Sequence, residues 1–307
     1  MKKICILTIL FLSLTSMLSA AFKDSGWGVR PLGMAGAFTA IADDSNAPLF
    51  NPAGLAVMEE NEISLMSAKL FTGLEGVDIS LNYLTYINVF DESVGNFGIT
   101  WAAMSSLNLY REDTVNISYG RSIYSDEYDL MVGANLKYLS HTYTLDVRTA
   151  DDPVFANGTI RGVATADIGF LFMLPYPAVS FAVVGKNLSS PDIGLETLDK
   201  VPSEYVFGVS YFNERMPYIT FPMCTFALDL VSRDKTMDYR FGFETWISDE
   251  RLAIRSGICS QSFNIGVGYE FEVMFDKALS VDYAFAFPLE IEETTGSHRI
   301  GLTFRFP

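Results

Sequence analysis

Cysteine and histidine are scarce in this chain of 307 residues, which has 3 Cys and 2 His. Cys5 lies in an apolar stretch near the N-terminus, so only Cys224 and Cys259 remain in the rest of the chain. In alternating strand patterns, Cys224 shares the apolar face and Cys259 lies on the other face. Opposite faces of a wall cannot bring two Cβ atoms to about 4 Å. We therefore expect two free thiols and no disulfide framework.

Positive charge and long apolar runs are also scarce. The chain has 21 Lys and Arg against 37 Asp and Glu, so its net charge is −16. Phosphates repel such a chain, and we expect no nucleic-acid partner. After the N-terminal stretch, no apolar run reaches the roughly 20 residues that a membrane helix needs. With 49% hydrophobic residues, the chain is either a secreted all-β protein or a transmembrane β-barrel, whose apolar residues alternate.

Catalytic and metal-binding patterns are missing as well. We interpret His141 as a solvated residue where the fifth strand meets a long loop, and His298 as the start of the last strand. A hydrolase would need a Ser–His pair with an orienting group, and neither phosphate-binding loops nor clusters of metal ligands are present. Asp43 and Asp44 are sequence neighbours that point in different directions. We expect no enzyme, no cofactor and no metal site.

The N-terminus has the pattern of an export signal. Lys2 and Lys3 precede an almost wholly apolar stretch, residues 4–14, and small residues follow at 16–21. This pattern predicts a signal peptide over residues 1–20, with cleavage after Ala20 or Ala21. A membrane helix is the alternative, but the apolar run is too short for one.

From residue 61 to the C-terminus, apolar and polar residues alternate with the period of a strand. The pattern predicts 14 strands, at residues 62–71, 78–90, 97–103, 113–123, 128–138, 160–173, 178–188, 204–212, 223–233, 237–247, 251–259, 263–273, 278–287 and 297–306. Aromatic residues make up 14% of the chain, as girdles at two membrane interfaces would require. The two longest connections, 141–159 and 189–203, both follow odd-numbered strands. A soluble sandwich gives no reason for this sorting, so we predict an all-β fold, a 14-stranded antiparallel transmembrane barrel in the cell outer membrane, in contact with its lipid.

The last strand ends in alternating large apolar residues, with Gly301, Leu302, Phe304 and Phe306 as its characteristic positions. It resembles the signal by which outer-membrane barrels are recognised by the barrel-assembly machinery. Pro307 follows the final aromatic residue and departs from that pattern.

Residues 21–60 show neither strand alternation nor a helical stripe. They contain Gly33-Met34-Ala35-Gly36-Ala37, Ala42-Asp43-Asp44 and Asn51-Pro52-Ala53-Gly54-Leu55. These motifs resemble the N-terminal hatch of FadL-type outer-membrane proteins, and are most similar to the PorV-like branch of the type IX secretion system. The resemblance implies a hatch or ligand gate inside the barrel of residues 61–307, with the gate residues Gly33, Gly36, Asp43, Asp44, Phe50, Asn51, Pro52, Ala53 and Gly54. A turn-rich linker is the alternative.

Glycine and alanine make this stretch slim enough for a lumen, and its asparagines and prolines suit turns and caps. Asp43 and Asp44 could pair with inward-facing arginines, for which the candidates are Arg240, Arg255, Arg299 and Arg305. An apolar ligand pocket could be lined by Met131, Trp246, Met274, Phe38, Leu49 and Phe50.

Two functions remain open on this basis. The first is transport of a hydrophobic small molecule such as a long-chain fatty acid, gated by the hatch. The second is a PorV-like carrier or partner for exported proteins, which would bind the connections 141–159 and 189–203. An apolar pocket that touches the hatch favours transport, and a polar lumen packed by the hatch favours the partner role. A plain porin is a weaker third option, since a hatch would obstruct it.

Overall fold

The computed structural model describes residues 22, 26–91, 93–124, 129–149, 151–174, 178–213, 223–234, 236–248, 251–273 and 277–307. The predicted signal peptide, Tyr128, Met274 and most of the connection 213–222 lie outside the described residues. Among the residues that are described, no helix is long and apolar enough to cross a membrane.

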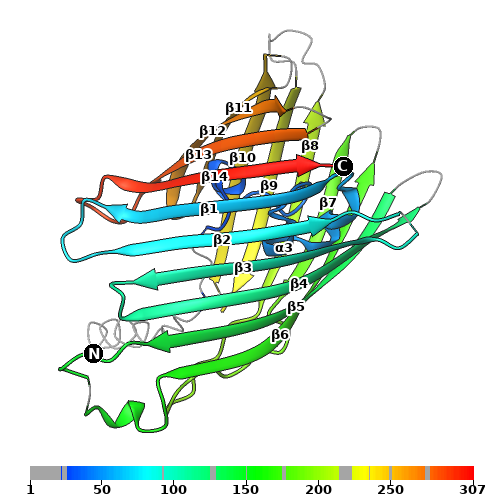
Figure 1. Cartoon of the computed structure of the whole chain (residues 1–307). Coiled ribbons are helices and arrows are strands. Elements are labelled where there is room, and N and C mark those ends of the chain that lie inside the picture. The colour runs from blue at the N-terminus through cyan, green and yellow to red at the C-terminus, as the bar shows by residue number, and fades with distance from the viewer. Residues whose placement is uncertain are drawn as a thin grey trace, which may run out of the picture.

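Fourteen antiparallel strands form a closed barrel in which each strand pairs with its neighbours in sequence and β1 pairs with β14 (Figure 1). The strands are β1 Asn61–Thr72, β2 Ile79–Asn88, β3 Asn96–Ser106, β4 Tyr110–Tyr124, β5 Asp129–Tyr143, β6 Ile160–Leu174, β7 Val179–Lys186, β8 Glu204–Asn213, β9 Met223–Arg233, β10 Thr236–Ile247, β11 Leu252–Cys259, β12 Ser262–Val273, β13 Lys277–Pro288 and β14 Gly296–Phe306. The predicted all-β fold and strand number are confirmed, and the strands differ from the predicted ranges mainly at their ends.

The two ends of the barrel differ. At one end β1 begins beside the end of β14, where Asn61 pairs with Phe306. We call this the turn end. The opposite end carries the two longest described connections, 144–159 and 187–203, and we call it the loop end. The first of these contains the short 3₁₀ helix η2, Pro153–Phe155.

Alternation along the strands separates an apolar outer face from a polar inner face. In β1, buried and exposed residues alternate from Glu62 onward. Large apolar side chains point outward and stay exposed, as in Ile117 (57%) and Leu136 (63%). A water-soluble fold buries residues of this kind, whereas the lipid-facing wall of a barrel exposes them.

Residues 26–58, which we call the N-terminal segment, cross the interior of the barrel (Figure 1). The segment contains the helices α2 Val29–Gly33 and α3 Ala47–Phe50 and the 3₁₀ helix η1 Pro52–Val57. Its side chains are largely buried, and Met34 and Phe38 are fully so. The core of the protein therefore lies between this segment and the inner wall.

The interpretation of His141 as a solvated loop residue is wrong. Strand β5 continues to Tyr143, and position 141 faces inward with Leu139. His141 is only 2% exposed, and its ring lies 5.0 Å from that of Tyr143 and 6.1 Å from that of Tyr110. Both remaining cysteines are free, as expected.

Replacing Ile117 by Arg tests whether the outer face of the barrel contacts lipid or water. Ile117 lies at the middle of β4 and points outward, and a midplane Arg costs about 2–4 kcal/mol in a lipid-facing barrel strand. We expect Ile117→Arg to lower the unfolding free energy by that amount, measured by urea unfolding in phospholipid vesicles with the heat-shifted gel mobility of the barrel. Ile117→Leu is the control and should match the parent. Equal stability of the Arg and Leu variants would contradict a lipid-facing wall.

Candidate functional site

Asn51 joins the turns of the N-terminal segment to the wall. It is fully buried, and its side-chain amide donates to the carbonyl of Thr39 at 3.0 Å and of Phe170 on β6 at 3.3 Å. Its side-chain oxygen accepts from the backbone N–H of Ala53 at 3.1 Å and so caps η1. Pro52 follows as the first residue of η1, where a missing N–H costs nothing. The expected capping role of Asn51 is confirmed.

Three neighbouring glycines of the wall lie against η1. Gly120, Gly133 and Gly169 are register neighbours on β4, β5 and β6. A Cβ at Gly133 would lie 2.3 Å from the backbone nitrogen of Ala53, and one at Gly169 would lie 2.1 Å from Asn51 Oδ1. Real Cβ atoms do not approach so closely, so only glycine lets the two backbones meet.

Two further wall glycines lie against the loop after α2. Gly242 and Gly257 are register partners on β10 and β11, and a Cβ on either would lie less than 3.0 Å from atoms of Met34. Within the segment itself, a Cβ at Gly54 would lie 1.9 Å from the carbonyl oxygen of Ala42. The wall and the segment are therefore shaped to each other at several points.

Inward polar side chains satisfy the backbone of the segment from many sides. The Asp229 carboxylate accepts from the N–H groups of Phe38 at 3.1 Å and Thr39 at 3.0 Å. Further contacts of this kind come from Glu62 to Ser45 N, Asn96 to Leu55 O and Met58 O, Asn135 to Pro48 O, Ser210 to Ala40 O and Asn264 to Leu32 O. Buried backbone groups need such partners.

Arg30 is the centre of an ion network that extends from the exposed Asp43 to the buried Glu244. Its guanidinium lies 2.6 Å from Asp43 and 3.0 Å from Asp44, and it binds Glu244 on β10 through two nitrogens at 2.9 and 2.8 Å. Arg255 on β11 binds the same Glu244 at 2.6 Å. Burial alone would lower the pKa of Arg30, but the carboxylates of Asp43, Glu244 and Asp44 hold this pKa above its ordinary value. The network ties the segment to the wall by paired charges.

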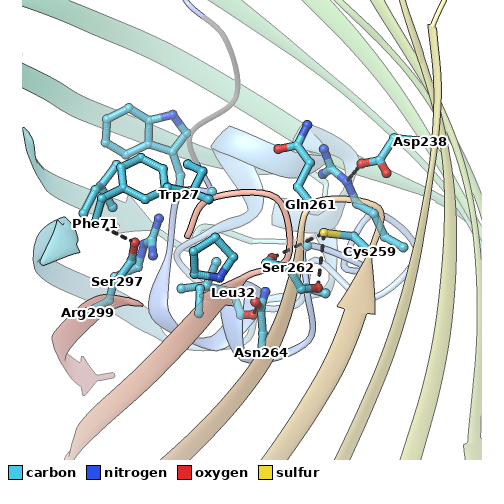
Figure 2. A pocket seen from close by; sticks show the side chains of 18 of the residues that line it. Trp27, Leu32, Phe71, Asp238, Cys259, Gln261, Ser262, Asn264, Ser297 and Arg299 are labelled. Atoms are coloured by element: carbon cyan, nitrogen blue, oxygen red, sulfur yellow. Dashed lines mark hydrogen bonds and ion pairs between the residues drawn. The ribbon is translucent and has the colours of Figure 1, made fainter. Parts of the chain in front are cut away.

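A cavity of about 430 Å³ lies between the segment and the wall toward the loop end (Figure 2). Trp27, Leu32 and Phe71 supply apolar surface. Polar lining comes from Arg240, Arg299, Asn264, Ser262 and Cys259, among others. Its volume is in the range of small-ligand pockets.

The family model described as "Type IX secretion system membrane protein PorP/SprF" matches residues 44–304. The chain belongs to the PorP/SprF family. The sequence has no significant match among curated proteins.

Solved structures of similar fold are barrels of the FadL type. This PorP/SprF chain resembles the CymD monoaromatic hydrocarbon channel at 12% identity and a TM-score of 0.59, over 93% of this chain and 98% of that one. It resembles the toluene transporter TbuX of Ralstonia pickettii at 11% identity and a TM-score of 0.57, over 92% of this chain and 99% of that one. It also resembles a FadL homologue of Pseudomonas aeruginosa at 10% identity and a TM-score of 0.51, over 91% of this chain and 96% of that one. At such low identity these likenesses show the fold alone, and the predicted FadL-type barrel fold is confirmed.

The partners expected for Asp43 and Asp44 are wrong. The four candidate arginines do face inward, but both carboxylates pair with Arg30 of the segment itself. Arg240 pairs with Asp238 and Arg305 with Glu62. Arg30 lies thirteen residues before Asp43, so a turn within the segment brings them together before any wall residue is needed. One signal in the sequence pointed to this pairing, because Arg30 is the single cation among residues 26–58.

The expected pocket lining is mostly wrong for this PorP/SprF barrel. Of the proposed residues, Phe50 lines the cavity, while Phe38 packs edge-on against the Phe50 ring at 5.5 Å. Met131 is buried against Ala40 and Ala53 instead, and Trp246 lies under the guanidinium of Arg255. The other gate glycines border the wall, since Gly33 abuts Arg255 and Gly266, and Gly36 abuts Arg240.

The four C-terminal positions are placed on β14. Leu302 points outward and is 44% exposed, and the rings of Phe304 and Phe306 stack at 5.6 Å. Gly301 faces inward, where a Cβ would lie 2.8 Å from Val29. Their role in assembly stays a prediction.

Alanine at Gly133 tests the fit between wall and segment. Its Cβ would overlap backbone atoms of Pro52 and Ala53, whereas a Cβ at Gly162 on β6 would meet only the end of the Tyr138 side chain. We expect Gly133→Ala to lower the unfolding free energy by about 1–3 kcal/mol and to expose the segment to limited proteolysis. Gly162→Ala is the matched control and should change little. If the two variants behaved alike, the segment would not depend on this contact.

Proposed function

We propose that this barrel is a sealed outer-membrane partner for exported proteins, in which the N-terminal segment acts as a fixed hatch and the loop end binds the exported protein. Membership of a family of type IX secretion membrane proteins supports a role in protein export. The observation that carries the proposal is the fit of the hatch backbone against the wall glycines.

That fit argues against an open passage. The hatch is hydrogen-bonded to inward side chains from β1 round to β12, and each such bond contributes about 0.5–1.5 kcal/mol. Displacing the hatch would also separate Arg30 from Glu244, whose side chain is 1% exposed. Separating a buried ion pair costs several kcal/mol, so a closed barrel is the favoured state.

The loop end offers a binding surface. Connection 187–203 is folded onto the barrel, where its residues Ile193 and Val201 are fully buried. Backbone N–H groups of Asp199 and Gly194 bind the Asp192 carboxylate and hold its pKa below the ordinary value. An ordered loop loses less entropy on binding than a flexible one.

Exposed apolar residues lie on both long connections of the loop end. Val147 is 98% exposed and Leu198 is 71% exposed, and both connections carry more acidic than basic residues. We therefore propose that the exported protein presents apolar side chains surrounded by Lys and Arg. Such binding weakens as salt screens the charges.

Site-specific photo-crosslinking tests the partner role in cells that produce type IX substrates. A crosslinker at Leu198 should capture an exported protein, identified by mass spectrometry, while one at Phe90 should not. Phe90 is 49% exposed at the turn end and is the matched control. Adding Val147→Asp should lower the Leu198 adduct at least tenfold. Equal adducts from Leu198 and Phe90, or none from either, would overturn the proposal.

A second candidate, uptake of a hydrophobic small molecule, is favoured by the cavity. Trp27, Leu32 and Phe71 could surround an apolar chain, and Arg240 and Arg299 could bind an anionic head group. The pocket touches the hatch through Gly36. The ligand of this class would be an amphipathic anion such as a long-chain fatty acid.

Filling the cavity tests this second candidate. Ala286 lines the cavity from β13, and Ala286→Trp should abolish saturable binding and uptake of a fluorescent long-chain fatty acid. Arg240→Gln should weaken binding about tenfold, since a hydrogen bond to a charged group contributes about 1.5–3 kcal/mol. Ala134→Trp, on the outer face of β5, is the control. Fatty-acid uptake that Ala286→Trp leaves unchanged would exclude this cavity as the route.

A further inference from the structure

Phe22 is held at the loop end, at the far end of the barrel from the start of β1. Its backbone N–H donates to Glu112 Oε1 at 3.1 Å. Glu112 lies on β4 opposite His141 of β5, near the loop-end termini of both strands. The Phe22 ring packs against the buried cluster of Leu139, Ile193 and Val201. The residue is therefore anchored by both its backbone and its side chain.

Glu112 has an unusual set of partners for a buried carboxylate. It faces inward and is 8% exposed. Its hydrogen bonds in the described part of the chain come from the hydroxyl of Tyr110 at 2.7 Å and from the amide of Phe22. Both donors are neutral in the unprocessed chain. A buried carboxylate is costly unless a positive charge compensates it.

The neighbouring cations each bind a carboxylate other than Glu112. Lys137 binds Asp167 at 2.9 Å. Lys186 and Arg233 both bind Glu204, at 3.2 and 2.9 Å. These side chains line the same small cavity as Glu112 and Phe22, and each of these cations already has a carboxylate partner.

We propose that the mature chain begins at Phe22 and that its α-ammonium group forms a buried ion pair with Glu112. The sequence predicts cleavage after Ala20 or Ala21, and the contact with Glu112 selects the second. Hydrolysis of the Ala21–Phe22 bond by the export signal peptidase consumes one water. Ala21 leaves with a carboxylate, and the Phe22 nitrogen gains the hydrogens that make it an ammonium group.

Processing thus replaces a neutral donor to the Glu112 carboxylate by a positively charged one, so that a hydrogen bond becomes an ion pair. It also leaves no chain before Phe22 to crowd the cluster of Leu139, Ile193 and Val201. Because Ile193 and Val201 belong to connection 187–203, the new N-terminus packs against this connection. Cleavage one residue earlier would place the ammonium group about 3.8 Å farther along the chain, beyond this contact.

The first test is the intact mass of the barrel purified from outer membranes, with sequencing of its N-terminal peptide. We expect a chain that starts at Phe22. A start at Ala21, at any other residue, or retention of residues 1–21 would overturn the proposal.

The second test measures the reactivity of the α-amine toward an acetylating reagent at pH 7 in the folded barrel. We expect at least tenfold slower acetylation than in the urea-unfolded chain, and at least tenfold faster acetylation in Glu112→Gln than in the parent. Glu196→Gln, an exposed loop carboxylate, is the matched control. Lys69, whose side chain is 59% exposed, should react equally in all variants and reports the reagent dose.

Glu112→Asp keeps the charge but shortens the side chain, and it should give an intermediate rate. This variant also serves if Glu112→Gln fails to assemble. A Phe22 amine that reacts equally fast in the parent and in the Glu112 variants would overturn the ion pair. The inference rests on the predicted signal peptide and not on the partner role, so loss of the Leu198 adduct would leave it standing.

Discussion

A backbone segment enclosed in a barrel must have its N–H and C=O groups satisfied without bulk water, and most features of this protein follow from that constraint. The N-terminal segment contains only short helices, so it cannot satisfy these groups internally as a long helix would. The wall supplies the missing partners through inward residues such as Asn96, Asn135, Asp229 and Asn264. The polar inner face is thus complementary to one particular fold of the segment.

The wall glycines are needed for the same reason, because these hydrogen bonds require a close approach of the segment to the wall. A carboxylate or amide can reach the segment only if the two backbones lie close together, and side chains at Gly133, Gly169 or Gly257 would hold them apart. The buried charges follow the same logic, because Arg30 and Glu244 compensate each other across the boundary between segment and wall. Specific packing of this kind favours one closed arrangement over a set of partly open ones.

Strand number and inward or outward orientation could be predicted because both depend on a period of two within single strands. Leu136 and Arg255 point to the expected faces for that reason. Contacts across the lumen could not be predicted, since they depend on the stagger of fourteen strands and on the path of the segment. Arg30 replaced the wall arginines as the partner of Asp43, and Met131 packs on Ala53 and not on a ligand pocket.

The local backbone conformation of the N-terminal segment could not be predicted from the sequence either. Ala35 and Ala42 adopt positive φ angles of 54° and 37°, which L-residues rarely adopt. They lie between the helices, where the buried contacts of Met34 and Phe38 select conformations that the sequence does not favour. Strain of this kind persists only when the surrounding packing imposes it, as the contact of Ala42 with Gly54 does here.

The cavity, the anchored Phe22 and the exposed Val147 and Leu198 all lie toward the loop end, whereas the tightest packing of η1 is against wall residues nearer the turn end. This asymmetry has a physical consequence. A molecule that arrives at the loop end meets apolar surface and a cavity before it meets η1, and it can bind there without any movement of the N-terminal segment. Binding at the loop end therefore does not depend on passage through the barrel in this fold.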